Sequence, residues 1–262
     1  MGYRQFGVLF YAIHGARMTA SSNPMRFGRF DSYDPTLIGS PGPMLILGPP
    51  GSGKGTQSAE IALRWDIPRI STGDLLRINV GQDTRLGRAA DGYIRRGQLV
   101  PDGLIGDMVL ERLENSDTLS GFILDGFPRT VRQAIWLDDL LSGQSQILPP
   151  IILSIHVNID CLISRITRRM ICRLCGAIYH EEFRTPFSAG ICDRDGTLLE
   201  QRVDDTLDVF RARLDVYEAQ TEPIIERYRN SNRFFTVDGD RPIHHVTETI
   251  IETIRCSRLQ VE

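Results

Sequence analysis

Lysine is almost absent from this sequence of 262 residues: Lys54 is the only lysine among its 30 lysine and arginine residues. Arginine replaces lysine at most solvated positions at little cost in free energy, so composition alone explains the arginines but not the remaining lysine. That lysine stands in a glycine-rich stretch, GPPGSGKGT, which runs from Gly48 to Thr56. We infer that this position needs a property of the ammonium group that a guanidinium lacks.

Long apolar runs and a strong net charge are missing as well. No stretch approaches the roughly 18 consecutive apolar residues that a membrane-spanning helix requires, so we expect no membrane partner. The formal net charge is −3. An acidic balance argues against a general affinity for nucleic acid, although it leaves small anionic ligands open.

Cysteine is scarce, and its distribution is uneven. Three of the five cysteines, Cys172, Cys175 and Cys192, fall in one short segment, which favours a metal knuckle over a disulfide framework. A reducing interior, and therefore the cytoplasm, is the simplest expectation. Cys161 and Cys256 lie in apolar helical settings and are predicted to be ordinary core residues.

The first 42 residues differ in composition from the rest. The stretches SSNP, DSYDP and GSPGP are turn-forming and weakly apolar, so residues 1–42 are predicted to be a flexible N-terminal leader. A targeting segment and a mis-assigned start remain open alternatives.

From residue 43 onward the sequence alternates between two kinds of pattern. Short apolar runs read MLIL, FILD, IILSIHV and FFTVD, and helical patterns cover residues 53–65, 104–113, 131–141 and 207–228. This alternation predicts an α/β fold with a mostly parallel sheet, helices on both faces, and ligands beyond the carboxyl ends of the strands. Residues 71–100 and 168–205 interrupt the alternation and are predicted to be excursions from the core.

The glycine-rich stretch has the context of a phosphate-binding loop. An apolar strand precedes it and a helix begins near Gly53, so backbone N–H groups and the helix dipole can face phosphate oxygens. Lys54 would extend to the β- and γ-phosphates, where a planar guanidinium would be too wide. The residue directly after Lys54, where the phosphate-loop motif has a Ser or Thr hydroxyl, is Gly55, and the hydroxyl comes one place later, at Thr56.

Asp125 closes the FILD run and is a candidate to hold Mg²⁺, or a cap of the following turn.

Four motifs in order make the chain resemble the adenylate kinases. They are GPPGSGKGT, ISTGDLLR (residues 70–77), GQLVPD (residues 97–102) and DGFPRTVRQA (residues 125–134). The resemblance runs from about residue 44 to residue 254. It implies a P-loop core (43–70, 101–167 and 206–262), a monophosphate-binding arm (71–100) and a small zinc-stapled lid (168–205). It also implies Mg²⁺-dependent transfer of a phosphoryl group from ATP to AMP, giving two ADP, by a monomer.

The resemblance assigns site residues motif by motif. For ATP it implies Gly51, Ser52, Gly53, Lys54, Gly55, Thr56, Arg165, Arg169, Ile178, Tyr179 and Arg241. For AMP it implies Thr72, Arg77, Gln98, Leu99, Val100, Gly126, Phe127, Pro128, Arg129, Gln133, Arg202 and Arg213, with Gln133 reading the adenine edge. The catalytic set would be Lys54, Asp125, Arg129, Arg169, Arg202 and Arg213, and Asp204 and Asp205 would lie at the lid hinge. Thr72 favours adenylate over a pyrimidine monophosphate as the acceptor.

The cysteine segment is predicted to hold a structural zinc ion. Cys172 and Cys175 form one knuckle, and Cys192 with Asp195 forms the other, although Asp193 is a second carboxylate at that turn. A metal-free lid with reduced cysteines remains the alternative. Other residues of this segment, Arg168, Arg173 and His180, are expected on the surface.

Two other functions compete with the leading one. A nucleoside monophosphate kinase with a different acceptor base would have the same fold and the same phosphate loop. A nucleic-acid-binding module would instead use the zinc knuckle and arginines for binding and the loop as a regulatory switch. The acidic balance and the absence of aromatic residues among the basic ones argue against the second.

Overall fold

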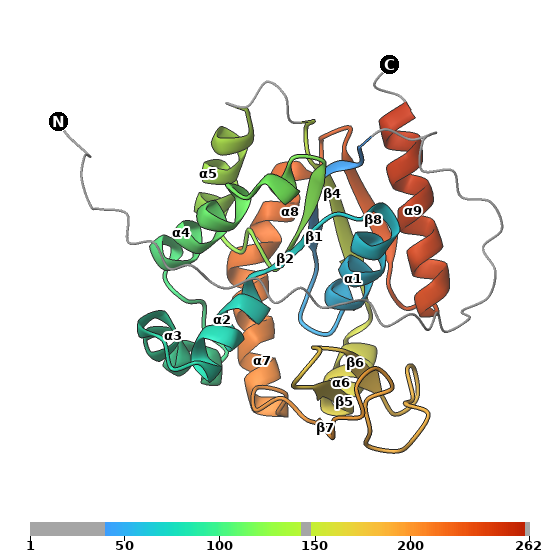
Figure 1. Ribbon diagram of the computed structural model, residues 1–262. Coiled ribbons are helices and arrows are strands. Elements are labelled where there is room, and N and C mark those ends of the chain that lie inside the picture. Colours follow the sequence, from blue (N-terminus) through green and yellow to red (C-terminus); the bar gives the residue numbers. More distant parts are fainter. Residues whose placement is uncertain (1–39, 143–147, 260–262) are drawn as a thin grey trace. The chain divides into compact units, whose positions relative to one another are not determined.

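The apolar runs of the sequence form a parallel β-sheet in the computed structural model, which describes residues 40–142 and 148–259. Within these residues the strands of this sheet are hydrogen-bonded in the order β2-β3-β1-β4-β8 (Figure 1). They are β1 (Gly42–Leu47), β2 (Arg69–Ser71), β3 (Gly121–Asp125), β4 (Ile151–His156) and β8 (Phe234–Asp238). All neighbouring pairs run parallel, so the predicted α/β class is confirmed.

The strand β2 is the one that sequence patterns miss. The other four strands of the sheet coincide with the predicted apolar runs, but β2 has only three residues and begins with the charged Arg69. Its backbone pairs with β3, placing Arg69 opposite Ile123 and Ser71 opposite Asp125. A hydrogen-bonding partner more than 50 positions away in the sequence, and not a local pattern, makes this segment a strand.

Helices connect the strands at the predicted places. The helix α1 (Lys54–Trp65) follows the glycine-rich loop directly. The predicted helix over 207–228 is α7, a π-helical turn at Tyr217–Thr221, and α8 in succession. The remaining bounds are α2 (Thr72–Gly81), α3 (Arg85–Arg95), α4 (Asp102–Leu113), α5 (Val131–Ser142), α6 (Ile159–Thr167), α7 (Leu207–Val216), α8 (Glu222–Tyr228) and α9 (Ile243–Leu259), with a 3-10 turn at Ser116–Thr118.

Both faces of the parallel sheet are buried, and the side chains of β1 alternate between them. Leu45 packs on one face in a cluster that includes Leu137 of α5 and residues of α4 and α8. Met44 packs on the other face with Ile61 of α1 and Ile250 of α9. Because helices cover both faces, the carboxyl ends of the strands are the part of the sheet left for a ligand.

Two segments extend from this layered core. The first consists of α2 and α3, which pack against each other within residues 71–100. The second carries a small antiparallel sheet in the order β6-β5-β7. Its strands are β5 (Arg169–Cys172), β6 (Ile178–His180) and β7 (Leu199–Glu200). Its apolar cluster is small, so this sheet needs a local staple to be rigid.

The predicted leader, residues 1–42, lies almost entirely outside the described residues. Its last residue, Gly42, is the first residue of β1 and pairs with Gly121, so the core begins one residue before the predicted start. No helix in the described ranges is long and apolar enough to cross a membrane.

Candidate active site

The glycine-rich loop joins the carboxyl end of β1 to the first turn of α1, and its glycines are required by its geometry. Gly53, which precedes α1, has a backbone φ of 92°, a value that residues other than glycine rarely adopt. A Cβ atom on Gly48 would lie 2.6 Å from the carbonyl oxygen of Ile155. The loop can therefore pass close to β4 and still present its backbone N–H groups at a helix N-terminus, where anions bind.

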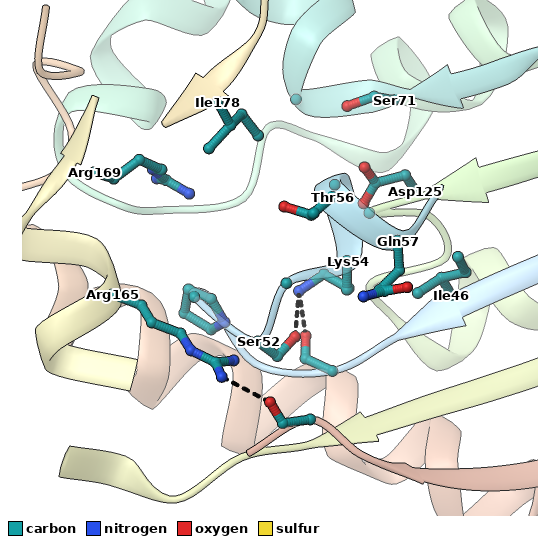
Figure 2. A pocket seen from close by; sticks show the side chains of 18 of the residues that line it. Ile46, Ser52, Lys54, Thr56, Gln57, Ser71, Asp125, Arg165, Arg169 and Ile178 are labelled. Atoms are coloured by element: carbon teal, nitrogen blue, oxygen red, sulfur yellow. Dashed lines mark hydrogen bonds between the residues drawn. The ribbon is translucent and has the colours of Figure 1, made fainter. Parts of the chain in front are cut away.

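Lys54 lies inside this loop. Its Nζ donates hydrogen bonds to the carbonyl oxygens of Gly48, at 2.6 Å, and of Pro49, at 2.7 Å (Figure 2). Burial lowers the pKa of Lys54 to about 7; Asp125 opposes this shift, and neighbouring arginines, Arg129 first among them, add to it. A compact ammonium fits between two carbonyl groups at these distances, whereas a planar guanidinium would not.

A cavity of about 560 Å³ opens in front of the loop. In Figure 2 the side chains of Lys54, Thr56, Arg165 and Arg169 extend toward it from the loop, α1, α6 and β5. The cavity brings together every residue expected to contact ATP: Gly51, Ser52, Gly53, Lys54, Gly55, Thr56, Arg165, Arg169, Ile178, Tyr179 and Arg241. Of the expected catalytic residues, Asp125, Arg129, Arg202 and Arg213 line it too.

A second, smaller cavity of about 60 Å³ is bordered by the arm and by the loop after β3. Its lining includes these residues expected at AMP: Thr72, Arg77, Gln98, Leu99, Val100, Gly126, Arg129, Gln133 and Arg213. Arg77, Arg129 and Arg213 line both cavities, so the same guanidinium groups border both. The two cavities are thus neighbours that share three cationic side chains.

Three residues expected at AMP do not line the small cavity: Pro128 and Arg202 line only the large one, and Phe127 lines neither. The side chain of Phe127 is fully buried, and its ring meets that of Trp136 edge-on at 6.0 Å. Its place among the residues expected at AMP stays a prediction. Phe127 supports the loop from the core, because a large apolar ring gains more from burial than from contact with a phosphate.

The positive charge of this site is only partly compensated. Burial, together with the neighbouring Arg213, lowers the pKa of Arg129 to about 10. Burial and the neighbouring Arg77 lower the pKa of Arg202 to about 9. Each of these shifts measures the free-energy cost of placing cations side by side away from water. A bound polyanion would remove that cost.

Two buried carboxylates at the predicted hinge hold arginines in place. Asp205 accepts a hydrogen bond of 2.7 Å from Nε of Arg169, and Asp204 accepts one of 3.1 Å from Nη1 of Arg213. The exposed fractions of Asp204 and Asp205 are only 4% and 1%. Because buried carboxylates with such partners are fixed in position, the arginines are oriented before any ligand arrives.

Asp74 is a charged residue of the site that sequence reasoning missed. Its carboxylate accepts a hydrogen bond of 2.6 Å from Arg77 and also pairs with Arg69 and, at 3.7 Å, with Arg202. Burial acts to raise the pKa of Asp74, but Arg77 and Arg69 outweigh it and hold the pKa well below its usual range. The spacing of Asp74 and Arg77, three residues apart on one helix, was the available signal.

Asp125 ends β3 at the floor of the large cavity, as its position after an apolar run predicts. Its Oδ2 accepts hydrogen bonds of 3.2 Å from Ser58 of α1 and 3.2 Å from Nε of Arg69. Ser58 and Arg69 are further residues that the sequence did not single out. Their contacts join α1, β2 and β3 at this carboxylate.

His180 is buried, so its predicted surface position is wrong. Its Nδ1 accepts hydrogen bonds from the backbone N–H groups of Glu182, at 3.0 Å, and Phe183, at 3.3 Å. Its Nε2 lies 3.3 Å from the carbonyl oxygen of Ser164 and therefore carries the proton, because a carbonyl only accepts. The imidazole thus ties the small sheet to α6, and local sequence alone shows no such partner.

The predicted metal ligands lie together at one end of the small sheet. One ligand atom from each of Cys172, Cys175, Cys192 and Asp195 lies within 4.8 Å of all the others. The Sγ atoms of Cys175 and Cys192 are 3.5 Å apart. Tetrahedral zinc with bonds of about 2.3 Å to sulfur requires sulfur atoms about 3.8 Å apart, so this donor set suits zinc.

The structure separates the two candidate carboxylates of this cluster. Asp195 lies 3.3 Å from Sγ of Cys172, whereas Asp193 accepts a hydrogen bond of 2.8 Å from the backbone N–H of Phe187. The hydroxyl of Tyr179 lies 3.5 Å from Sγ of Cys192, so its tip faces the cysteines, and Tyr179 is also one of the residues that line the large cavity. Tyr179 therefore connects the cluster to the ligand site.

Of the remaining expectations, those for two arginines are confirmed and those for two cysteines are wrong. Arg168 and Arg173 form ion pairs with Glu182 and Glu200, and their side chains are 47% and 74% exposed, so their surface positions are confirmed. Cys161 is half-buried and Cys256 is exposed, so neither is the core residue that was predicted. The buried positions on α9 include Val246, Ile250 and Ile254, and Cys256 lies off that stripe.

Comparison with known proteins identifies relatives over most of the chain. The sequence model of the family described as "Adenylate kinase" matches residues 46–233. A curated adenylate kinase of Clostridium perfringens is 44% identical over 211 residues, which are 80% of this chain and 97% of that protein. Those of Clostridium tetani (45% identity, 79% of this chain, 95% of that protein) and Clostridium acetobutylicum (46%, 79% and 96%) match similarly.

The lowered pKa of Lys54 predicts how the stability of the ligand-free protein depends on pH. The pKa is about 7 in the folded chain and about 10.4 when unfolded, so the unfolded chain binds more protons between these values and stability rises with pH. Lys54→Met removes this dependence. From pH 7 to pH 9, the melting temperature of the wild type minus that of Lys54→Met should rise by about 4 °C or more.

The measurement is a set of thermal melts at several pH values, with Arg173→Met as a control that alters an exposed cation. The Arg173→Met difference should stay flat with pH. A Lys54→Met difference that is flat or falls would contradict the buried, weakly basic ammonium.

Proposed function

Because this chain belongs to the adenylate kinase family, it is a nucleoside monophosphate kinase, and we propose that its reaction is the reversible, Mg²⁺-dependent transfer of the γ-phosphoryl group of ATP to AMP, giving two ADP. The observation that carries the proposal is the pair of cavities bordered by the same guanidinium groups, those of Arg77, Arg129 and Arg213. Family membership also favours an enzyme over the nucleic-acid-binding switch.

The donor nucleotide occupies the large cavity in this proposal. The backbone of residues 51–56 surrounds its phosphates, and Lys54 exchanges its two carbonyl partners for phosphate oxygens. Arg165 and Arg169 approach from α6 and β5, and Arg165 is already fixed by a hydrogen bond of 2.7 Å to the carbonyl oxygen of Gly239. Arg241 and Tyr179 complete the ATP side of the cavity.

The acceptor binds at the small cavity, which has to widen for a nucleotide because its volume is only about 60 Å³. Arg77 and Arg129 bind its phosphate, and the Thr72 hydroxyl, which donates a hydrogen bond of 2.9 Å to the carbonyl oxygen of Gly126, shapes the space beside it. Gln133, which is 5% exposed, faces the base. Backbone groups of residues 98–100 close the cavity from the arm.

Transfer itself needs alignment and charge neutralisation more than acid-base chemistry. The reacting phosphoryl group develops charge on its equatorial oxygens, and preorganised cations stabilise that charge. Arg129 and Arg213 line both cavities, so they can contact phosphates of both nucleotides, and Arg202 lines the large cavity beside them. The uncompensated charge described above becomes favourable when the nucleotides are bound.

The donor is proposed to bind together with Mg²⁺, which would neutralise part of the negative charge of its phosphates. Asp125 is the residue that fits it, because a single carboxylate beside the phosphate loop is the usual protein contribution to such a site. Thr56 lines the same cavity and offers the hydroxyl that Gly55 lacks.

We assign residues 71–100 to the monophosphate-binding arm and residues 168–205 to a lid. Water accepts a phosphoryl group as readily as AMP does, so both must cover the nucleotides before transfer. Arg169 lies within the lid segment, with Arg165 just before it and Arg202 at its end, so phosphates supply the counter-charge that favours closure. A cytoplasmic location and a monomeric state stay predictions.

The lid is further proposed to hold zinc through Cys172, Cys175, Cys192 and Asp195, whose donor atoms fit a tetrahedral set. Zinc would supply rigidity to a segment whose own apolar cluster is small. Its role is then structural, because four protein ligands leave no position for a substrate.

The direct test of the reaction is ADP formation from ATP and Mg²⁺ with AMP, CMP, UMP or GMP offered in turn, alongside a control without acceptor. AMP should give by far the fastest turnover, and the control should show almost none. Preference for another monophosphate would overturn the roles of Thr72 and Gln133, and ATP hydrolysis without acceptor would overturn the exclusion of water.

Lys54→Arg tests the need for an ammonium group. Its kcat should fall roughly 100-fold or more, because the guanidinium does not fit between carbonyl oxygens 2.6 and 2.7 Å from Nζ. A cooperative melting transition well above the assay temperature would exclude unfolding as the cause. A rate within tenfold of the wild type would show that the loop accepts either cation.

Cys172→Ser tests the zinc staple. The variant should lose bound zinc, about one ion per chain in the wild type, and its melting temperature should fall by roughly 5 °C while kcat at 25 °C changes less than threefold. Cys256→Ser, which alters an exposed thiol outside the cluster, is the matched control. Equal zinc content and equal melting curves for both variants would argue for a metal-free lid.

A further inference from the structure

Both ends of the Gln133 amide are held by hydrogen bonds to other groups of the protein. Its Nε2 donates a hydrogen bond of 2.7 Å to Oδ1 of Asp102, the first residue of α4. Its Oε1 accepts one of 2.7 Å from the backbone N–H of Arg129. Asp102 lines neither cavity, so it reaches the acceptor site only through Gln133.

These two partners determine which way round the amide stands. An ionised carboxylate only accepts hydrogen bonds, so the group that faces Asp102 must be the NH₂. A backbone N–H only donates, so the group that faces Arg129 must be the carbonyl oxygen. A flipped amide would oppose oxygen to oxygen at one end and N–H to N–H at the other.

Thr130 holds the Asp102 carboxylate itself. Its hydroxyl donates a hydrogen bond of 3.2 Å to Oδ2 of Asp102 and accepts one of 3.1 Å from the backbone N–H of Gln133. The start of α4 and the start of α5 are therefore joined by a closed ring of hydrogen bonds. Within this ring, the only freely rotating hydroxyl is that of Thr130.

The orientation of the amide matters because purine bases differ at the edge that it would read. Adenine presents an amino group as donor and a ring nitrogen as acceptor, whereas a 6-oxopurine presents an oxygen as acceptor and a ring N–H as donor. One amide orientation complements the first pair at a given position, and the flipped orientation complements the second. The Gln133 amide keeps one N–H and one lone pair for this contact.

We propose that Asp102 is a positioning residue that sets the base specificity of the acceptor site by locking the amide orientation of Gln133. This inference rests on the proposed function, in which Gln133 faces the base of the acceptor. It goes further in assigning the choice between adenine and a 6-oxopurine to a carboxylate that touches neither nucleotide.

Asp102 also stands in the first turn of α4, where a negative charge favours the helix dipole. A residue with that role alone would change stability and would alter turnover of all acceptors alike. Only a residue that orients Gln133 changes the ratio between two acceptors that differ at the base edge. The test must therefore measure a ratio.

Asp102→Asn is the decisive variant, because it keeps the shape but can offer either an oxygen or an NH₂ to Gln133. The acceptors are AMP and inosine monophosphate, which differ in the substituent at carbon 6 and in protonation of the neighbouring ring nitrogen. We expect kcat/KM for AMP to fall about three- to tenfold, mainly through KM, while that for inosine monophosphate stays constant or rises. The KM for ATP should not change.

Asp107→Asn is the matched control, since it removes an exposed carboxylate from the same helix. Its ratio of kcat/KM values for the two acceptors should equal that of the wild type. An unchanged ratio in Asp102→Asn, or an equal loss with both acceptors, would overturn the inference. If the wild type fails to turn over AMP at all, the proposed function fails instead, so the two failures are distinguishable.

A second variant covers the case in which Asp102→Asn does not fold. Thr130→Val removes the donor that holds Asp102, and Thr130→Ser keeps it. Thr130→Val should shift the ratio of the kcat/KM values for the two acceptors in the same direction by a smaller factor. Thr130→Ser should keep the ratio of the wild type. Equal ratios in both Thr130 variants would contradict the lock.

Discussion

Buried positive charge that the protein's own carboxylates compensate only in part is the constraint on which the rest of this structure depends. Lys54, Arg129 and Arg202 are cations in a site where burial and like charges lower their pKa values to about 7, 10 and 9. The fold retains them because the α/β architecture places the loop after β1 and side chains of residues 71–100 and 168–205 around one cavity at the carboxyl ends of the strands. Nucleotide phosphates convert this free-energy cost into binding and transition-state stabilisation.

Buried and half-buried carboxylates fix the positions of the arginine side chains. Asp74, Asp204 and Asp205 each hold an arginine by a hydrogen bond, and Asp125 connects α1, β2 and β3 beneath the loop. None of these acids cancels the field of the site, because the arginines outnumber them there. They fix the orientations of the arginine side chains instead, so these side chains lose less conformational entropy when a ligand binds. Asp102 extends the same principle from charge to base recognition, since its partner is a neutral amide.

Sequence patterns predicted the fold well where the physical cause is local. Apolar runs marked β1, β3, β4 and β8, and 3.6-residue periodicity marked α1, α4, α5 and the α7–α8 segment, because burial of one face or of a whole strand leaves a trace in adjacent residues. The strand β2 left no such trace, because pairing with β3 creates it. His180, Cys161 and Cys256 were misplaced for a related reason: burial and contacts of a single side chain depend on distant elements.

The sequence by itself determined the chemistry of the loop and of the cysteine cluster. A glycine-rich turn between a strand and a helix and the paired knuckle spacing act over a few residues, so their geometry follows from local backbone constraints. Only the tertiary structure decided that Asp195 and not Asp193 faces the cysteines, and that Asp102 meets Gln133 across 31 positions. Such choices depend on how separate elements pack, because a hydrogen bond is set by direction and distance in space, and sequence separation specifies neither.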